Sequence, residues 1–159
     1  MVTPAHPPRL RETLRECSLP AALEAMGERW AFLILRAAFN GLHHFEEFQG
    51  ELGIARNILA NRLTRLVDHG ILQREPLPGD RRKIRYSLTE KGHALLPMVE
   101  LRQWGELWEL GEPAFPVLVD TRDRRPIAPV AVHAEDGRVL GQGDLIWALP
   151  EEVRAAAAE

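Results

Sequence analysis

The segment between Gly53 and Gly92 constrains the fold of this chain most, because it holds one helical pattern followed by one hairpin pattern. At about 100° per residue from Arg56 onward, apolar residues gather on one side of a helix and polar residues on the opposite side. The apolar side comprises Leu59, Leu63, Leu66 and Val67, and the polar side comprises Asn57, Asn61, Thr64, Arg65 and Asp68. We therefore expect the apolar side to pack and the polar side to stay exposed.

A hairpin is predicted directly after this helix. Gly70 is suited to the position that ends a helix, where the backbone often adopts a positive φ. Residues 71–74 begin a strand, and residues 76–80, which include two prolines and a glycine, are expected to form a turn. Residues 81–88 then return with alternating polar and apolar side chains. This order of helix, turn and basic hairpin is typical of a winged reader of DNA.

Charge is concentrated in the same part of the chain. Residues 55–93 hold nine Lys or Arg and four Asp or Glu, a net charge of +5, whereas residues 1–54 carry −2 and residues 94–159 carry −6, giving −3 in total. A phosphate-binding surface gathers positive charge in this way, since each neutralised phosphate releases condensed counterions. A solvated basic face is the alternative interpretation of the charge alone. Joined to the helix and hairpin, the charge favours double-stranded DNA as the partner.

The polar side of the helix and the hairpin loop supply the candidate DNA contacts. Asn57 and Asn61 lie one turn apart, and an Asn side chain can pair with both N6 and N7 of adenine in the major groove. Arg56, Arg62 and Arg65 are suited to phosphate or to guanine. The basic hairpin, called the wing below, would follow the DNA backbone or enter the minor groove. Its candidate residues are Arg81, Arg82, Lys83 and Arg85.

Length and composition indicate one core domain with an appendage. The chain has 159 residues, of which 45% are hydrophobic, enough for a full core. It has neither an apolar run long enough to span a membrane nor a secretory leader, so we expect a cytoplasmic protein without a membrane partner. Cys17 is the one cysteine, which excludes a disulfide within the chain and a cysteine-based zinc cluster. No metal or cofactor is expected.

The residues before Gly53 predict an arm and three helices. Residues 1–16 are rich in proline and then in charge, and we interpret them as a flexible arm. A short helix is expected up to Met26, with Ser18 as its cap and Pro20 in its first turn. Residues 28–40 form the clearest amphipathic helix. Another helix is marked by Phe45, Phe48 and Leu52, and Gly53 joins it to the polar-striped helix as a helix-turn-helix unit.

A further helix is expected after the wing, capped by Thr89 and kinked or restarted at Pro97. Its apolar residues cover more than one face, and include Leu95, Met98, Val99, Leu101, Trp104, Leu107 and Trp108. Such a surface must be covered, either by a second copy of the chain or by the N-terminal helices of the same chain. Trp30, Trp104 and Trp108 are candidates for an effector pocket or for the core of a dimer.

Composition shifts after Gly111, which separates residues 17–110, the DNA-binding and dimerisation domain, from residues 111–159. Short β-prone runs occur at residues 115–120, 127–133 and 138–140. They predict a small antiparallel module of two to four strands, covered in part by Trp147. The expected fold class is therefore mainly α with a β-hairpin wing, a winged helix-turn-helix, plus a small β-rich C-terminal extension.

Residues 17–105 resemble the HxlR-type winged helix-turn-helix family of bacterial transcription regulators. The similarity is carried by an ordered set of pieces: Cys17, residues 23–30, Ile34-Leu35-Arg36, residues 45–48, residues 52–59, Arg62-Leu63, Gly70-Ile71-Leu72 and residues 86–92. The resemblance implies a cytoplasmic homodimer that binds an inverted-repeat operator, acts as a repressor, and responds to an electrophile or a small ligand. It also implies that the N-terminal helix and the helix after the wing form the dimer.

Three residue positions bear on this resemblance. Cys17 lies where the family often has a sensing thiol, although a small buried residue packed at a helix start is the preferred interpretation. Ala55 stands where many members have Ser, so the polar-striped helix lacks a capping hydroxyl. Some relatives carry paired Cys and His ligands in a C-terminal extension, whereas His133 here has no cysteine beside it. Three acidic residues of this extension, Asp120, Asp123 and Asp144, are interpreted as turn residues.

Two other functions remain open at this stage. The first is a winged-helix module that binds protein partners without sequence-specific DNA binding. The second is an enzyme that uses His93 or His133, but the sequence holds no nucleophile motif, phosphate loop or ligand set, so we do not expect an enzyme. His43 and His44 resemble a metal or pH-sensing pair, and a role in a loop or in a phosphate contact is the preferred interpretation.

Overall fold

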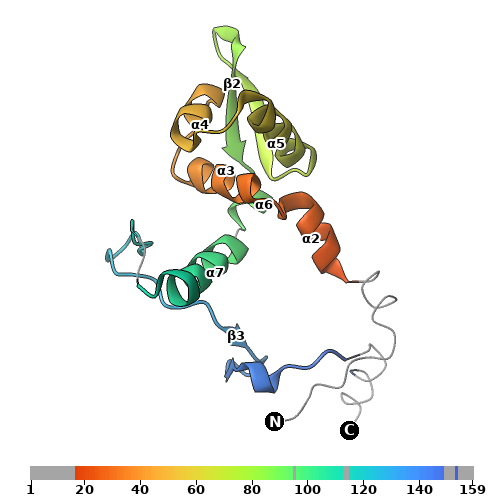
Figure 1. Cartoon of the computed structure of the whole chain (residues 1–159), viewed down its shortest axis with the longest axis vertical. Helices are drawn as coiled ribbons and strands as arrows, with labels where there is room; N and C mark the ends of the chain where they lie inside the picture. The colour runs from red at the N-terminus through yellow and green to blue at the C-terminus, as the bar shows by residue number, and fades with distance from the viewer. Residues whose placement is uncertain (1–16, 95, 113–114, 149–152, 154–159) are drawn as a thin grey trace.

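The computed structural model of the protein describes residues 17–94, 96–112, 115–148 and 153 (Figure 1). The helices of its first part are α2 (Ser18–Met26), α3 (Arg29–Phe39), α4 (Phe45–Leu52) and α5 (Arg56–Asp68). The hairpin strands β1 (Leu72–Leu77) and β2 (Asp80–Leu88) follow, and then α6 (Glu90–His93), α7 (Leu96–Gly105) and the π-helical turn η1 (Glu106–Leu110). The predicted arm at residues 1–16 lies outside the described residues.

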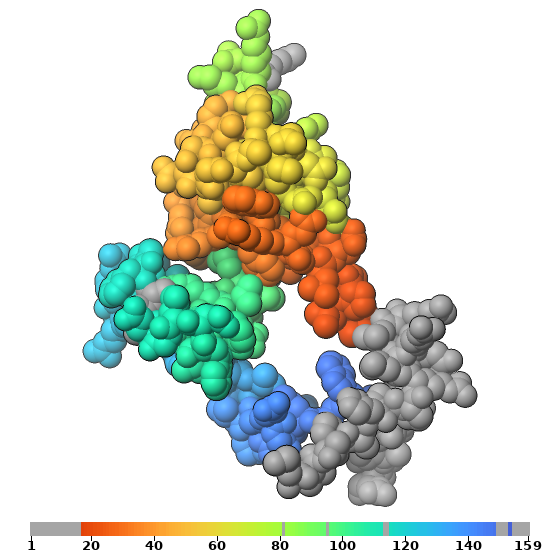
Figure 2. Space-filling view, viewed as in Figure 1, coloured from red at the N-terminus to blue at the C-terminus, as the bar shows by residue number. Residues whose placement is uncertain are grey.

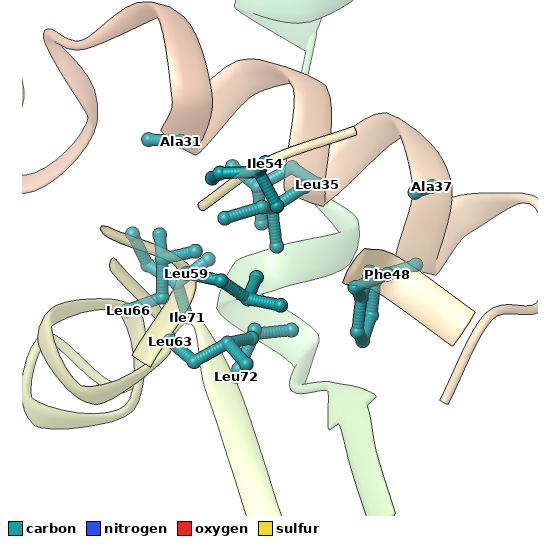
Figure 3. Packing of buried hydrophobic residues seen from close by; sticks show 12 residues of the cluster. Ala31, Leu35, Ala37, Phe48, Ile54, Leu59, Leu63, Leu66, Ile71 and Leu72 are labelled. Carbon is teal, nitrogen blue, oxygen red and sulfur yellow. The ribbon is translucent and has the colours of Figure 1, made fainter. Parts of the chain in front are cut away.

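The core lies where α3, α4 and α5 meet the base of the hairpin (Figure 3). Its largest fully buried side chains are Phe48, Ile34, Leu35, Leu59, Leu63, Leu66, Ile71 and Leu72. The apolar side predicted for α5 is confirmed, since Leu59, Leu63 and Leu66 are buried. Each such side chain contributes roughly 1.5 to 3 kcal/mol through burial, so packing fixes which side of α5 faces out.

The hairpin is longer than the sequence predicts. β1 and β2 are antiparallel, with Leu72 opposite Leu88 and Pro76 opposite Ile84. The expectation that Pro76 begins the turn is therefore wrong, because the tight turn lies at Pro78 and Gly79 instead. Pro76 is exposed on β1, an edge strand of this two-stranded sheet, where the missing N–H of a proline is tolerated.

The start of α2 also differs from the prediction. The helix is capped by Cys17 rather than by Ser18, which is already its first residue. The Cys17 Sγ accepts a hydrogen bond from the Leu19 N–H at 3.4 Å. A sulfur acceptor is weak, and no propensity rule ranks Cys among the usual caps, so the sequence favoured the neighbouring serine.

The segment after the wing confirms the predicted cap and the predicted restart. The Thr89 Oγ1 accepts from the Gly92 N–H at 3.1 Å and donates to the Gly70 carbonyl at 2.7 Å. A Cβ added to Gly92 would collide with the carbonyl oxygen of Ile71, so the close approach of α6 to the hairpin base requires glycine here. α6 ends at His93, and α7 begins at Leu96 with Pro97 in its first turn.

The described part of the chain leaves much of the α7 surface uncovered. Exposed apolar residues on α7 and η1 are Leu96, Leu101, Trp104, Leu107, Trp108 and Leu110. Leu19 and Leu23 on α2 are exposed as well, and among the described residues of α7 Met98 alone packs against the core. Figure 1 shows α7 and β3 on the opposite side of α3 from the hairpin. No helix among the described residues has the length and apolar character needed to cross a membrane.

The described part of the C-terminal extension holds two antiparallel strands, the lower end of the predicted range of two to four, and is otherwise irregular. One antiparallel pair, β3 (Val132–His133) with β4 (Val139–Leu140), forms its described sheet, followed by the short 3-10 helix η2 (Gln142–Asp144). The prediction that Trp147 covers this module is wrong, since its side chain is 86% exposed. The extension instead attaches to α7 through Gln103, whose amide donates to the Ala128 carbonyl and accepts from the Val130 N–H.

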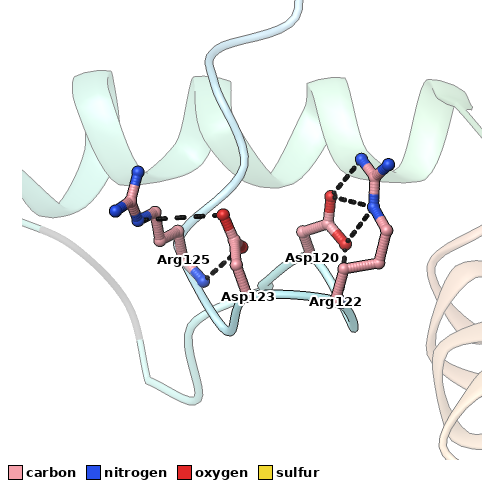
Figure 4. A network of polar contacts seen from close by, with 4 residues as sticks. All are labelled: Asp120, Arg122, Asp123 and Arg125. Atoms are coloured by element: carbon pink, nitrogen blue, oxygen red, sulfur yellow. Dashed lines mark hydrogen bonds and ion pairs between the residues drawn. The ribbon is translucent and has the colours of Figure 1, made fainter.

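The acidic residues of the extension are turn residues, as predicted. Asp120 accepts from the backbone N–H of Arg122 at 2.8 Å, and Asp123 accepts from that of Arg125 at 3.0 Å (Figure 4). The Arg122 guanidinium also binds Asp120, and these contacts hold the pKa of that carboxyl below its usual value. Asp144 accepts from the Gly141 N–H, so each carboxylate stabilises a local turn.

Candidate nucleic-acid interface

α4 and α5 form a helix-turn-helix unit, and α5 presents its polar side to solvent. Gly53 joins the two helices with a φ of 59°, a conformation that glycine adopts without the steric penalty of a side chain. Arg56, Asn57 and Asn61 are all exposed. Ala55 makes no side-chain cap, so the N–H groups at the start of α5 are not capped from that position.

An open groove lies between the starts of α4 and α5 and the wing. Its volume is about 570 Å³. It is lined by His44, Phe45, Glu46, Arg56, Arg82, Lys83, Ile84 and Tyr86. This lining contains three cationic side chains and one carboxylate. The groove is therefore suited to the anionic backbone of DNA. Arg56 is held at its edge by a cation–π contact with Phe45, 4.7 Å from the ring centroid.

The wing projects from the body as an exposed ridge, seen at the top of Figure 2. Arg82 and Lys83 are exposed near its tip, and Asp80 accepts from the Arg82 backbone N–H at 3.1 Å. Arg85 is exposed nearer the base. Arg81 lies in β2, but its side chain is outside the described set. The structure thus places two of the four predicted wing cations, Arg82 and Lys83, in the groove that Arg56 of α5 also lines.

His43 and His44 hold the base of the wing. The Tyr86 N–H donates to the His43 carbonyl at 2.7 Å, and the Nδ1 atoms of His43 and His44 lie 3.0 Å from the carbonyls of Tyr86 and Ile84. A carbonyl only accepts, so each Nδ1 carries the proton, and the His43 Nε2 can accept from the Arg85 guanidinium at 3.4 Å. The loop role preferred for these histidines agrees with this geometry, although the sequence gave no indication of their strand partners.

Glu47 stabilises the same junction from α4. Its Oε2 accepts from the backbone N–H groups of His43 and His44, at 2.8 and 2.9 Å. These two hydrogen bonds lower the pKa of the Glu47 carboxyl, because they favour its charged form. Tyr86 packs edge-on against Phe48 at 6.5 Å, and burial raises the pKa of its hydroxyl. The base of the wing is therefore fixed by both polar and aromatic contacts.

Arg62 and Arg65 are engaged by acidic residues at the end of α2 and just before α3. The Arg62 Nη2 forms an ion pair with Glu28, and the Arg65 Nη2 binds Glu24 at 2.8 Å. Arg65 also donates to the Glu24 carbonyl and lies 3.8 Å from Glu28. A DNA contact by either arginine would require an exchange of partner. The sequence could not show these pairs, since the acidic partners lie more than thirty residues away.

The three candidate tryptophans do not line a common pocket among the described residues. Trp30 is half-buried against the core and lies under the Arg29 guanidinium, whereas Trp104 and Trp108 are exposed on α7 and η1. The groove beside the wing and the small hollow beside α2 are both lined without tryptophan. The effector pocket therefore stays a prediction.

Comparison with known proteins decides the family. The model of the HxlR-like helix-turn-helix family matches residues 25–112, more than half of the chain. The protein belongs to the HxlR-like helix-turn-helix family. The family segment of this HxlR-like protein contains α3 to η1 and hence the whole interface described above. The family resemblance and the winged helix-turn-helix fold expected from the sequence are both confirmed.

Several relatives are similar to this HxlR-like protein. An uncharacterized HTH-type transcriptional regulator of Mycobacterium tuberculosis is 44% identical over 90 residues, which are 56% of this chain and 57% of that relative. The chain thus covers little more than half of that relative's length. The crystal structure of PA1607, a candidate transcription factor, matches with a TM-score of 0.76 and 39% identity over 83% of this chain and 94% of that one. The reduced form of the redox regulator HypR matches with a TM-score of 0.53 and 29% identity, over 57% of this chain and 92% of that one.

Proposed function

We propose that this HxlR-like protein is a transcriptional regulator that binds an inverted-repeat DNA operator as a homodimer and represses the genes behind it. The observation that carries the proposal is the joint exposure of Asn57 and Asn61 on α5 beside the basic groove. A helix of this kind is wide enough to fill a major groove. The name of the mycobacterial relative, an HTH-type transcriptional regulator, supports the same function.

The interface divides into base-reading and backbone-binding residues in this proposal. Asn57 and Asn61 read base edges, and Arg56 contacts guanine or the adjoining phosphate. Arg82, Lys83 and Arg85, together with Arg81, neutralise the backbone beside the wing, which adds affinity to every sequence alike. One strand of the DNA backbone then lies in the groove between α5 and the wing.

The apolar surfaces of α2 and α7 support a dimer of this chain. Leu107 and Trp108 are 67% and 69% exposed, and Leu19 and Leu23 of α2 are more than half exposed. Exposed apolar side chains gathered on a helix of a small domain are typical of a protein interface. A two-fold dimer presents two copies of α5, which matches an operator with inverted half-sites. Occupation of a promoter by such a dimer accounts for repression.

A response to an electrophile or an oxidant is proposed at Cys17. The Sγ atom is half-buried and caps α2, one of the two helices assigned to the dimer. Modification of the sulfur would add bulk or charge at the atom that accepts from the Leu19 N–H, and so disturb the start of α2. The solved relative HypR is named a redox regulator. A small ligand between the tryptophan-bearing helices is the other form that such a response could take.

The test of the proposed function is a selection of bound fragments from the source genome. Wild-type protein should enrich fragments that share an inverted repeat, and its affinity for them should fall steeply with salt. Asn61→Ala should lose that enrichment while it keeps the salt dependence of its residual binding. Equal affinity for selected and random DNA would reject the proposal. It would favour a winged-helix module for protein partners.

A further inference from the structure

The Arg62 guanidinium joins the exposed side of α5 to the loop before α3. Its Nη2 pairs with Glu28, and its Nη1 donates to the Asn61 Oδ1 at 2.7 Å. The Arg62 side chain is 22% exposed, and its Nε is buried without a hydrogen-bond partner among the described residues. The guanidinium therefore points into the body of the protein and along α5, whereas a phosphate contact needs it to face the DNA.

This arrangement fixes the orientation of the Asn61 carboxamide. An exposed Asn side chain turns easily about its last torsion, and half a turn exchanges its carbonyl oxygen with its amino group. A guanidinium has only donors, so it binds the Asn61 oxygen and repels the amino group. The carbonyl keeps a second lone pair and the amino group keeps its donors. Both are then available to a base in one fixed order.

We infer that Arg62 is a positioning residue for base recognition by Asn61, held in place by Glu28. The inference rests on the proposed function. Adenine is recognised when the amide oxygen accepts from N6 and the amino group donates to N7. With the amide fixed in this order, Asn61 discriminates adenine from bases with another pattern. When Arg62 is removed, the amide turns freely and the discrimination at that base pair falls.

Arg65 provides a matched control on the same helix. It also pairs with acidic residues, Glu24 and Glu28, and carries the same charge. Among the described residues, its hydrogen bonds go to the carbonyl and carboxylate of Glu24, and not to Asn61. Arg65→Met and Arg62→Met therefore remove the same charge from the same face. We expect only Arg62→Met to release the Asn61 amide.

The experiment selects bound sequences from a library of random duplexes with wild-type protein, Arg62→Met, Arg65→Met and Asn61→Ala. Arg62→Met should lose preference at the same base pair of each half-site as Asn61→Ala, by roughly tenfold. The slope of log affinity against log salt should stay unchanged in Arg62→Met. Arg65→Met should keep the wild-type base preference. In the double variant, Arg62→Met should not lower the base preference at that base pair below its value in Asn61→Ala alone.

A phosphate contact by Arg62 predicts a different outcome. Arg62→Met would then weaken binding to all sequences alike and reduce the salt slope by about 0.9, with base preference intact, and this result would overturn the inference.

Glu28→Gln, which keeps a hydrogen-bond acceptor but weakens the ion pair with Arg62, should give a smaller loss of preference at the same base pair. It serves as the second variant if Arg62→Met unfolds. Wild-type protein without any base preference would reject the proposed function and this inference together, whereas a wild-type preference that Arg62→Met retains would reject the inference alone.

Discussion

The Arg56 guanidinium lies over the Phe45 ring, with its central carbon 4.7 Å from the ring centroid. These are the first residues of α5 and α4, so the contact ties together the starts of both helices in the helix-turn-helix unit. Because Ala55 supplies no cap, this contact helps to order the start of α5. It also places a positive charge at the edge of the groove before any DNA is present.

Phe45→Leu should weaken DNA binding without unfolding the protein. The substitution keeps an apolar side chain but removes the aromatic face, and an exposed cation–π contact contributes about 0.5 to 1 kcal/mol. A two- to fivefold loss of affinity is expected in a fluorescence anisotropy titration. Phe45→Tyr retains the ring and should bind as wild type does. Equal losses in both variants would assign the effect to packing.

Arg82→Ala should reduce affinity for every sequence by the same factor. Arg82 is exposed near the tip of the wing, where it is suited to bind phosphate. The loss of one phosphate contact lowers the salt slope of binding by about 0.9. Titrations of operator and random DNA across a salt series measure this slope. Arg138→Ala, which removes an arginine from the turn between β3 and β4, is the control. A slope that does not change would contradict the wing contact.

Particular residues show how far the sequence determines this fold and site. The period of Leu59, Leu63 and Leu66 predicted the buried side of α5, because burial on a helix follows from spacing alone. The prediction that Pro76 begins the turn is wrong, because a strand tolerates proline when its edge is open, and the sequence does not show which edges are open. The ion pair between Arg62 and Glu28 could not be predicted from the sequence, for a different reason. A contact between residues far apart in the chain depends on tertiary packing, which no local pattern records.

Glu47→Gln should destabilise the protein in a pH-dependent way. The hydrogen bonds from His43 and His44 lower the pKa of Glu47 below its ordinary value of 4.5. The stability that they supply is therefore present in full above pH 4.5 and is lost as the pH falls through the lower pKa of the folded state. The difference in unfolding free energy between wild type and Glu47→Gln should shrink over that range. Urea titrations at a series of pH values measure it, and a difference independent of pH would contradict the charged cap.

Leu107→Glu should dissociate the proposed dimer. The side chain is 67% exposed on η1, and a charge at the centre of an apolar interface costs roughly 2 kcal/mol, about thirtyfold in the dissociation constant. Sedimentation velocity over a concentration series reports the change. Ile146→Glu replaces an even more exposed apolar residue, 80% exposed, in the C-terminal extension. It should leave the dimer intact. Dissociation by both variants would place the interface elsewhere or extend it to the C-terminal extension.

Cys17→Ser separates the structural role of this residue from a sensing role. A serine hydroxyl is a stronger cap than a thiol, so the start of α2 should be retained or strengthened, and operator affinity should match that of wild type. Treatment with N-ethylmaleimide should weaken operator binding by wild-type protein and leave Cys17→Ser unaffected, because only a thiol is alkylated under mild conditions. Cys17→Ala, which has no cap acceptor, should lower the free energy of unfolding by less than about 1 kcal/mol, the usual loss for an oxygen cap, because a sulfur acceptor is weaker. If alkylated wild-type protein bound the operator with unchanged affinity, Cys17 would be a helix cap without a sensing function.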